Sequence, residues 1–349
     1  MLKQREWMTP KRRFLSALFG GRVDRAPVAN PTSLVTVELM ERTGAYFPDA
    51  HLDAEKMARL AATSYEVLGF DTIMPVFSAH TESAALGVPV DWGDKMSWPV
   101  NTSHPITDPE QIVIPDSFLE EPSMRTVLDA IKILRSQYGD RVAIIGKTYG
   151  PWSLAYHLVG TENFLMETIL NPDKARRYLE VLLEASLLSA KAQIKAGADA
   201  ILWGDHATGD LVSAEYYRDF LMKVHQYVTR EVGAPIILHI CGNTTKFIPY
   251  IVEAGFDAFH FDSKVDAKLA KELAGNKMSL IGNINNPVTL LAGTPEDVKK
   301  ETLYAIEAGV EIVGPECAIP LTTPLENILA ITETAKEYQI HKKLGGETQ

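Results

Sequence analysis

The sequence predicts a TIM barrel, an α/β fold in which eight parallel strands alternate with helices as (β/α)8. Eight short apolar runs are each followed by a helical pattern. The runs are continuous rather than alternating, as is typical of strands buried on both faces. An Ala-Gly pair comes shortly before an apolar run three times, at 196, 254 and 308, and marks a tight loop between a helix and the next strand. An open doubly wound sheet normally carries a glycine-rich phosphate loop after its first strand. The residues at and after the end of the first predicted strand, Asn30-Pro-Thr-Ser33, contain no glycine.

The helical segments are defined by periodicity and by their end signals. The helix at 55–68 ends at Gly69 and has apolar residues at helical spacing: Met57, Leu60, Ala61, Tyr65 and Leu68. The helix at 295–307 begins at Pro295, where a missing N–H costs nothing. The other predicted helices are 9–20, 35–40, 124–138, 162–195, 214–232, 246–253, 266–274 and 325–338, the first being an N-terminal helical extension.

The predicted strands are 26–30, 71–76, 142–147, 200–205, 235–241, 258–262, 278–285 and 311–317. We expect a single domain over 1–349. A long irregular insertion after the second strand, 77–122, is rich in Pro, Asp, Ser and Trp. Insertions of this length usually carry function or cover a mouth, so we expect this one near the active-site end of the barrel.

Composition excludes several classes of protein. The formal net charge of -11 argues against binding to nucleic acid or to an anionic membrane. No apolar run approaches the roughly 18 residues that span a bilayer, and the first seven residues contain no apolar signal segment. We therefore expect a cytoplasmic protein. Two cysteines in 349 residues exclude a disulfide framework.

Metal-binding side chains stand where strands of the barrel end. His239 and Cys241 end the fifth strand and point the same way, because side chains alternate along a strand. Cys317, the other cysteine, ends the eighth strand, and active sites of TIM barrels lie at these carboxyl ends. One histidine and two cysteines suit zinc and leave its fourth position open, as in catalytic sites. Water, substrate, Asp205 or Glu316 are candidates for that position.

Several of these residues also have ordinary structural readings. The cysteines could be inert buried thiols, and His239 could be a core histidine bonded to a backbone carbonyl. His260 and Asp262, on one side of the sixth strand, could support the metal, contact substrate or form a simple pair. Lys147 ends the third strand and either binds a substrate carboxylate or is solvated. The aromatic residues near strand ends line the pocket or pack in the core: Tyr149, Trp152, Tyr156 and Trp203.

Three motifs resemble the zinc-dependent methylcobamide:coenzyme M methyltransferases, which belong to the uroporphyrinogen decarboxylase-like superfamily. They are His239-Ile-Cys241-Gly-Asn243-Thr, Gly314-Pro-Glu-Cys317 and Thr323-Pro324-Leu-Glu-Asn327. The resemblance extends over nearly the whole chain. It includes Val23-Asp24-Arg25-Ala-Pro27 near the N-terminus and Gly282-Asn283 in the predicted seventh strand.

The resemblance implies a zinc ion held by His239, Cys241 and Cys317. It implies transfer of a methyl group from a methylated corrinoid protein to a thiol acceptor, with coenzyme M as the expected acceptor, which reacts as a zinc-bound thiolate. The chain has no corrinoid-binding motif of its own, so the corrinoid (cobalamin) must arrive on a partner protein. Asp205, His260 and Asp262 are then candidate catalytic residues. Asn243, Asn283 and Asn285 are candidate contacts to the cofactor.

Other functions within the same superfamily stay open at this point. A demethylating enzyme would move methyl from a methoxylated substrate, such as an aryl methyl ether, or another methylated substrate onto the corrinoid protein. Uroporphyrinogen decarboxylation is disfavoured because 30–34 contains no arginine to hold substrate carboxylates. A non-catalytic barrel that binds a corrinoid is the remaining alternative. Glu316 stands where close family members carry glycine, which leaves the methyl acceptor open.

Overall fold

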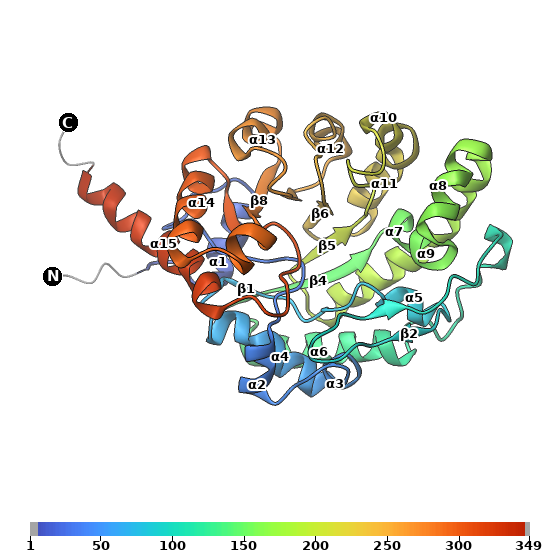
Figure 1. Ribbon diagram of the computed structural model, residues 1–349, viewed down its shortest axis with the longest axis horizontal. Coiled ribbons are helices and arrows are strands. Elements are labelled where there is room, and N and C mark those ends of the chain that lie inside the picture. The colour runs from blue at the N-terminus through green and yellow to red at the C-terminus, as the bar shows by residue number, and fades with distance from the viewer. Residues whose placement is uncertain (1–5, 346–349) are drawn as a thin grey trace.

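Seven parallel strands form one curled sheet in the computed structural model, which describes residues 6–345 (Figure 1). In chain order they are β1 (Thr72–Ile73), β4 (Ala143–Tyr149), β5 (Ala200–Gly204), β6 (Ile236–Ile240), β7 (Ala258–Phe261), β8 (Ser279–Ile284) and β9 (Ile312–Pro315). Each strand pairs only with its neighbours in this order, and every pair is parallel. The fold class predicted from the sequence is confirmed.

The segment predicted as the first strand, 26–30, forms a single bridge rather than a full strand. Val28 pairs in parallel with Val313 of β9, and the N–H of Ala29 donates to the Val313 carbonyl. On its other side, the Val28 carbonyl accepts from the N–H of Asp71, next to β1. The Val28 N–H donates to the Asp71 carboxylate, 2.8 Å away. The segment thus closes the barrel between β9 and β1. On the β1 side, the Asp71 carboxylate replaces a backbone carbonyl as the hydrogen-bond acceptor.

Helices alternate with the strands and surround the sheet (Figure 1). Those that join successive strands include α4 (Ala54–Glu66), α6 (Pro122–Tyr138), α9 (Pro172–Ala196), α11 (Met222–Glu231), α12 (Ile248–Ala254), α13 (Ala267–Ala274) and α14 (Pro295–Ala308), and α15 (Leu325–Gly345) follows β9. Shorter ones are α2 (Val37–Thr43), α3 (Asp49–Leu52), α8 (Thr161–Leu170), α10 (Ala214–Tyr216), η2 (Tyr217–Leu221) and η3 (Asn286–Leu291). The sequence reading missed α7 (Pro151–Val159), which directly follows β4.

The N-terminal helix α1 (Pro10–Leu18) packs at the amino ends of the strands. The Lys11 N–H donates to the carbonyl of Arg141, just before β4, and the Ser279 hydroxyl, at the start of β8, donates to the Ala17 carbonyl. Amino ends of parallel strands all lie on one side of a barrel. The helix therefore covers the side opposite the predicted active site.

The insertion 77–122 is less irregular than predicted and lies against α7. It contains α5 (Thr81–Ala85), a small antiparallel pair of β2 (Val90–Asp91) with β3 (Val100–Asn101), and η1 (Pro109–Gln111). Asn101 and His104 both donate side-chain N–H groups to the carbonyl of His157 in α7. Because α7 follows the carboxyl end of β4, the insertion reaches the carboxyl side of the barrel.

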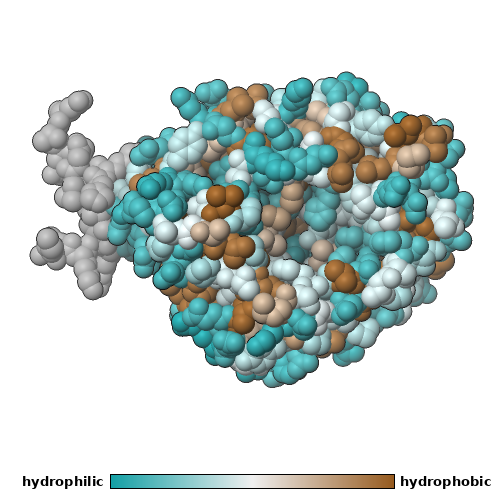
Figure 2. All heavy atoms as spheres, in the orientation of Figure 1, coloured by the Kyte–Doolittle hydropathy of each residue, from teal (hydrophilic) through white to brown (hydrophobic). Residues whose placement is uncertain are grey.

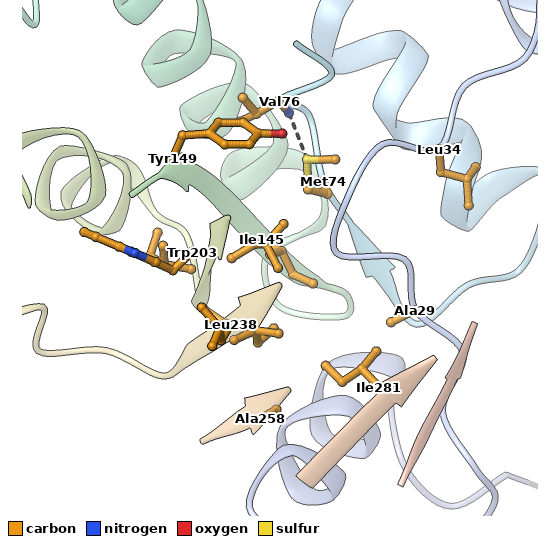
Figure 3. Close-up of a cluster of buried hydrophobic side chains, with 14 of the residues drawn as sticks. Ala29, Leu34, Met74, Val76, Ile145, Tyr149, Trp203, Leu238, Ala258 and Ile281 are labelled. Atoms are coloured by element: carbon orange, nitrogen blue, oxygen red, sulfur yellow. Dashed lines mark hydrogen bonds between the residues drawn. The ribbon is translucent and has the colours of Figure 1, made fainter. Parts of the chain in front are cut away.

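The buried core is a continuous apolar cluster built from every strand of the seven-stranded sheet. Figure 3 shows side chains of β4, β6, β7 and β8 in this cluster, among them Ile145, Leu238, Ala258 and Ile281. Trp152 and Trp203 are fully buried members of the same cluster, so core packing is the role the structure gives to both. Burial of apolar surface on this scale is the main stabilising term of the fold.

The surface in Figure 2 is polar over most of its area, with apolar residues in several small patches. This distribution is ordinary for a water-exposed protein surface. Across the described part of the chain, no helix has the length and apolar character needed to cross a membrane.

Candidate metal centre

His239, Cys241 and Cys317 come together at the carboxyl end of the barrel. His239 Nε2 lies 3.0 Å from Cys241 Sγ and 3.4 Å from Cys317 Sγ, and the two sulfurs are 3.5 Å apart. His239 is in β6, Cys241 directly follows it, and Cys317 lies two residues after β9. Among residues 6–345, this is the group of His, Cys, Asp and Glu atoms close enough to share a metal ion. Nitrogen and thiolate sulfur in this ratio are donors that suit zinc.

The imidazole of His239 is held in the tautomer that metal binding requires. Its Nδ1–H donates to the backbone carbonyl of His260, 3.1 Å away, so the lone pair of Nε2 faces the two sulfurs. Metal-bound histidines usually donate their other ring N–H in this way. His239 thus makes the hydrogen bond to a backbone carbonyl that is expected of a core histidine, and it also has the geometry of a metal ligand. The three donor atoms fit a zinc ion.

The two thiols have unequal acidities in this arrangement. The hydrogen bond from Cys241, together with the nearby His239, places the pKa of Cys317 well below its usual value. The same hydrogen bond to Cys317, with burial, raises the pKa of Cys241. Burial would lower the pKa of His239, but the charge on Cys317 outweighs it and raises that pKa. The site therefore favours a negative charge on sulfur, which a cation would neutralise.

His260 supports the ring of His239 from the neighbouring strand. The two rings are 4.6 Å apart between centroids, and the residues are register partners in β6 and β7. The Nε2–H of His260 donates to the Pro315 carbonyl at 2.8 Å, which links β7 to the end of β9. Burial lowers the pKa of His260 to about 3, so the ring is neutral at physiological pH.

Asp262 and Glu316 anchor the backbone around the two cysteines. Asp262 accepts from the N–H of Gly242, directly after Cys241, and from the N–H of Lys264. Glu316 precedes Cys317 and accepts from the N–H groups of Ser263 and Asn286. Both oxygens of each carboxylate are thus used by backbone donors. These bonds fix the loops that carry the sulfur atoms.

Replacing Glu316 by glutamine should weaken zinc binding, because the amide cannot accept two backbone hydrogen bonds through both of its ends. We expect a loss of roughly 10–100-fold in zinc affinity, the usual cost of disturbing groups that orient metal ligands. Competition with a chromophoric chelator measures it. Glu326→Gln, at an exposed position of α15, is the matched control. An unchanged affinity of Glu316→Gln would show that the loop needs no such anchor.

Asp205 lies behind β5 and outside the group of three metal-binding side chains. Its carboxylate accepts from the Ser153 N–H and from the ring of His225, both at 2.9 Å. The other ring nitrogen of His225 pairs with the Tyr217 hydroxyl at 3.0 Å. Gly150 allows this close packing, since a Cβ there would lie 2.2 Å from the Asp205 carboxylate. Because Ser153 belongs to α7 and His225 to α11, Asp205 joins the end of β5 to these two helices.

Comparison with known proteins supports the same assignment. The family model described as uroporphyrinogen decarboxylase (URO-D) matches residues 9–338. A methylated-thiol–coenzyme M methyltransferase of Methanosarcina mazei is 39% identical over 95% of this chain and 90% of its own length. A methylcobamide:CoM methyltransferase, MtaA of Methanosarcina barkeri, is 35% identical over 95% and 98%. A solved structure of a methyltransferase from Methanosarcina mazei superposes with a TM-score of 0.92 at 35% identity, covering 95% and 99%.

The chain belongs to the uroporphyrinogen decarboxylase family. Within that family it groups with the methylcobamide:coenzyme M methyltransferases, and it is an enzyme of the methyltransferase class. The resemblance seen in the sequence motifs is confirmed by these matches.

The three asparagines predicted to contact the cofactor lie at the same barrel end: Asn283 near the end of β8, Asn285 directly after it, and Asn243 in the loop after β6. Asn243 is exposed, and its side-chain oxygen accepts from Thr245. Asn283 donates to the Val265 carbonyl, and Asn285 donates to the Ser263 hydroxyl. Asn283 and Asn285 border one surface pocket. Their role toward a corrinoid stays a prediction.

Lys147 and Tyr149, which the sequence names as candidates, belong to a group of polar residues whose composition it did not predict. Tyr149 ends β4, and its ring lies 5.2 Å from that of His206 and 5.8 Å from that of His157. His80, from the insertion, packs 4.6 Å from His157. Lys147, two residues before Tyr149, is buried rather than solvated. The histidines come from the insertion, from α7 and from the loop after β5, so no local spacing in the sequence could have grouped them.

Proposed function

We propose that the protein transfers a methyl group from a methylated corrinoid, carried by a partner protein, to the thiol of coenzyme M. The observation that carries the proposal is the convergence of His239, Cys241 and Cys317 at the carboxyl end of the barrel. Relatives that cover nearly the whole chain are named for transfer between methylcobamide and coenzyme M. The three side chains support a metal at this site, and the names of the relatives support coenzyme M as the methyl acceptor.

Zinc is the metal that we propose for this site. His239 supplies Nε2, while Cys241 and Cys317 supply two thiolates, and among residues 6–345 no fourth protein ligand is placed with them. Zinc bound there would lower the pKa of an incoming thiol, which is otherwise near about 8.5 and mostly protonated at neutral pH. The two cysteines keep the site rich in electron density, which preserves the nucleophilicity of the substrate sulfur.

The protein's own residues prepare the site for that reaction. His260 orients His239 through ring packing and the backbone carbonyl. Asp262 and Glu316 hold the two cysteine loops in place. We propose positioning roles for these residues, and for Asp205 a role in fixing β5 against the helices behind it. The corrinoid partner must approach the carboxyl face, because that is where the reactive sulfur lies.

Transfer in the opposite direction is the second candidate. The 39% identical relative is named for a methylated thiol as well as for coenzyme M, which favours a methylated sulfur compound as a methyl donor. In that case the corrinoid protein would receive the methyl group before passing it on. The same zinc site would polarise the sulfur of the donor.

An assay with two arms distinguishes these functions. The purified protein is incubated with methylcobalamin and coenzyme M, and methyl-coenzyme M is measured; the second arm supplies dimethyl sulfide and cob(I)alamin. We expect methyl-coenzyme M in the first arm. Formation of methylcobalamin in the second arm alone would establish the reverse activity. No transfer in either arm, with zinc bound, would contradict both proposals.

A further inference from the structure

Lys147 is a buried cation without an acidic partner. It is 2% exposed, and its ammonium group donates to the Ser33 hydroxyl at 3.0 Å and to the Phe77 carbonyl at 3.4 Å. Among the described residues, no carboxylate lies within ion-pair distance of it; the nearby Glu82 is bonded instead to Thr148 and Ser189. An ammonium group has three donors, so one remains available. Burying a charge without a counter-charge is costly, which requires an explanation.

The ammonium group of Lys147 lies close to the loop that carries Cys317. Ser33, which it contacts, accepts through its own carbonyl from the N–H of Ile319. Asn30 donates its side-chain amide to the carbonyl of Cys317 at 3.2 Å. The loops at 30–33 and 317–319 are thus bonded together, and Lys147 reaches this junction from β4.

Tyr149 stands at the level of His239 in the sheet, and Lys147 lies two residues before it in β4. Tyr149 is the register partner of Gly204, and Gly204 is the partner of His239. The Lys147 ammonium lies 5.6 Å from the centre of the Tyr149 ring. The charge of Cys317 is one of the causes that raise the pKa values of both residues. Burial lowers the pKa of Lys147 to about 7, which a bound anion would reverse.

Polar histidine rings lie beside Tyr149 and His157, and two of the rings have a nitrogen without a hydrogen-bond partner among the described residues. The Nδ1 atoms of His157 and His80 are buried and have no hydrogen-bond partner in the described chain. His157 and His206 flank Tyr149. One side of the barrel end is therefore built from sulfur atoms that suit a metal and a thiol. The other side is built from a cation and neutral polar rings that suit an anion.

We propose that Lys147, with Tyr149 and His157 beside it, binds the anionic end of the thiol substrate and thereby selects short thiols that carry a terminal sulfonate or carboxylate. The proposal rests on the proposed function and names the substrate class for it. Coenzyme M, which is 2-mercaptoethanesulfonate, has this form. A small ligand with sulfur at one end and an anion at the other would bridge the two sides of the site.

The test compares thiols that differ only at the tail: coenzyme M, neutral 2-mercaptoethanol and cationic cysteamine. For the wild-type enzyme we expect kcat/KM to favour coenzyme M. In Lys147→Met, kcat/KM for coenzyme M should fall roughly 10–100-fold, the effect of one charged hydrogen bond, chiefly through KM. The value for 2-mercaptoethanol should change less than about threefold. Ser33→Ala removes the structural contact and keeps the cation, so it should retain the preference for coenzyme M.

Binding provides a readout independent of turnover and of whether Lys147→Met folds. Ethanesulfonate, which lacks the thiol, should compete with coenzyme M in the wild-type enzyme, whereas propanol should not. Failure of ethanesulfonate to compete, or an equal loss for coenzyme M and 2-mercaptoethanol in Lys147→Met, would overturn the inference. Absence of methyl transfer to every thiol by the wild-type enzyme would instead overturn the proposed function, and comparing ethanesulfonate binding between the wild type and Lys147→Met would still decide the role of Lys147.

Discussion

Cys317→Ser is expected to lose zinc and methyl-transfer activity together, by at least about 100-fold each. The hydroxyl of serine stays protonated at neutral pH and is a poor zinc ligand, while the remaining Cys241 and His239 cannot hold the ion in place. Disturbing the groups that orient metal ligands already lowers metal affinity or activity about 10–100-fold, so removing a ligand should lower them further. Metal analysis of the purified variant and the methylcobalamin assay measure the two effects.

The matched control for this variant is Lys132→Ala, at an exposed position of α6, which should keep both zinc and activity. Thermal unfolding of Cys317→Ser separates a lost site from a lost fold, since Cys317 lies on a loop after β9. Retention of stoichiometric zinc and full activity by Cys317→Ser would be incompatible with the proposed metal centre.

Asp71→Asn is expected to destabilise the protein by about 3–5 kcal/mol, the usual cost of breaking a buried ion pair. The Asp71 carboxylate is fully buried and accepts from both Arg13 and Arg25, at 2.6 and 2.8 Å. It also accepts from the Val28 N–H at the barrel closure. The substitution leaves two buried guanidinium groups short of negative charge. Chemical denaturation measures the change in the free energy of unfolding.

The matched substitution Asp49→Asn removes an exposed carboxylate that pairs with Lys56. Exposed pairs contribute about 0–1 kcal/mol, so this variant should unfold almost as the wild type does. A similar small effect in Asp71→Asn would mean that Arg13 and Arg25 are satisfied by Asp24 and Glu6 alone. Activity of the folded Asp71→Asn enzyme should be unchanged, because Asp71 is far along the chain from the metal ligands and bonds to groups near the amino ends of the strands.

The metal-binding group could be predicted from the sequence because strand geometry alone determines it. The i, i+2 spacing orients His239 and Cys241 together, and parallel strands bring Cys317 to the same end. The partners of Asp262, Glu316 and Asp205 could not be predicted, since they are backbone N–H groups and a histidine whose positions depend on loop paths. The helix at 151–159 was missed because Gly150-Pro151 reads as a break, although Pro151 occupies its first turn. The first strand was predicted to be longer than the single bridge at Val28. The Asp71 side chain takes the place of a backbone partner there, and hydrophobic periodicity cannot reveal such a contact.

The closure of the barrel at Val28 has a consequence for how the chain is made. Residues 27–29 sit between β1 and β9, and their partner Val313 is near the end of the chain. At about 5–20 residues per second, a ribosome needs on the order of tens of seconds to proceed from Val28 to Val313. Throughout that interval Val28 and Ala29, which are fully buried in the finished protein, lack one of their two neighbours. The nascent protein can therefore complete its barrel only after β9 has been synthesised and has left the ribosome.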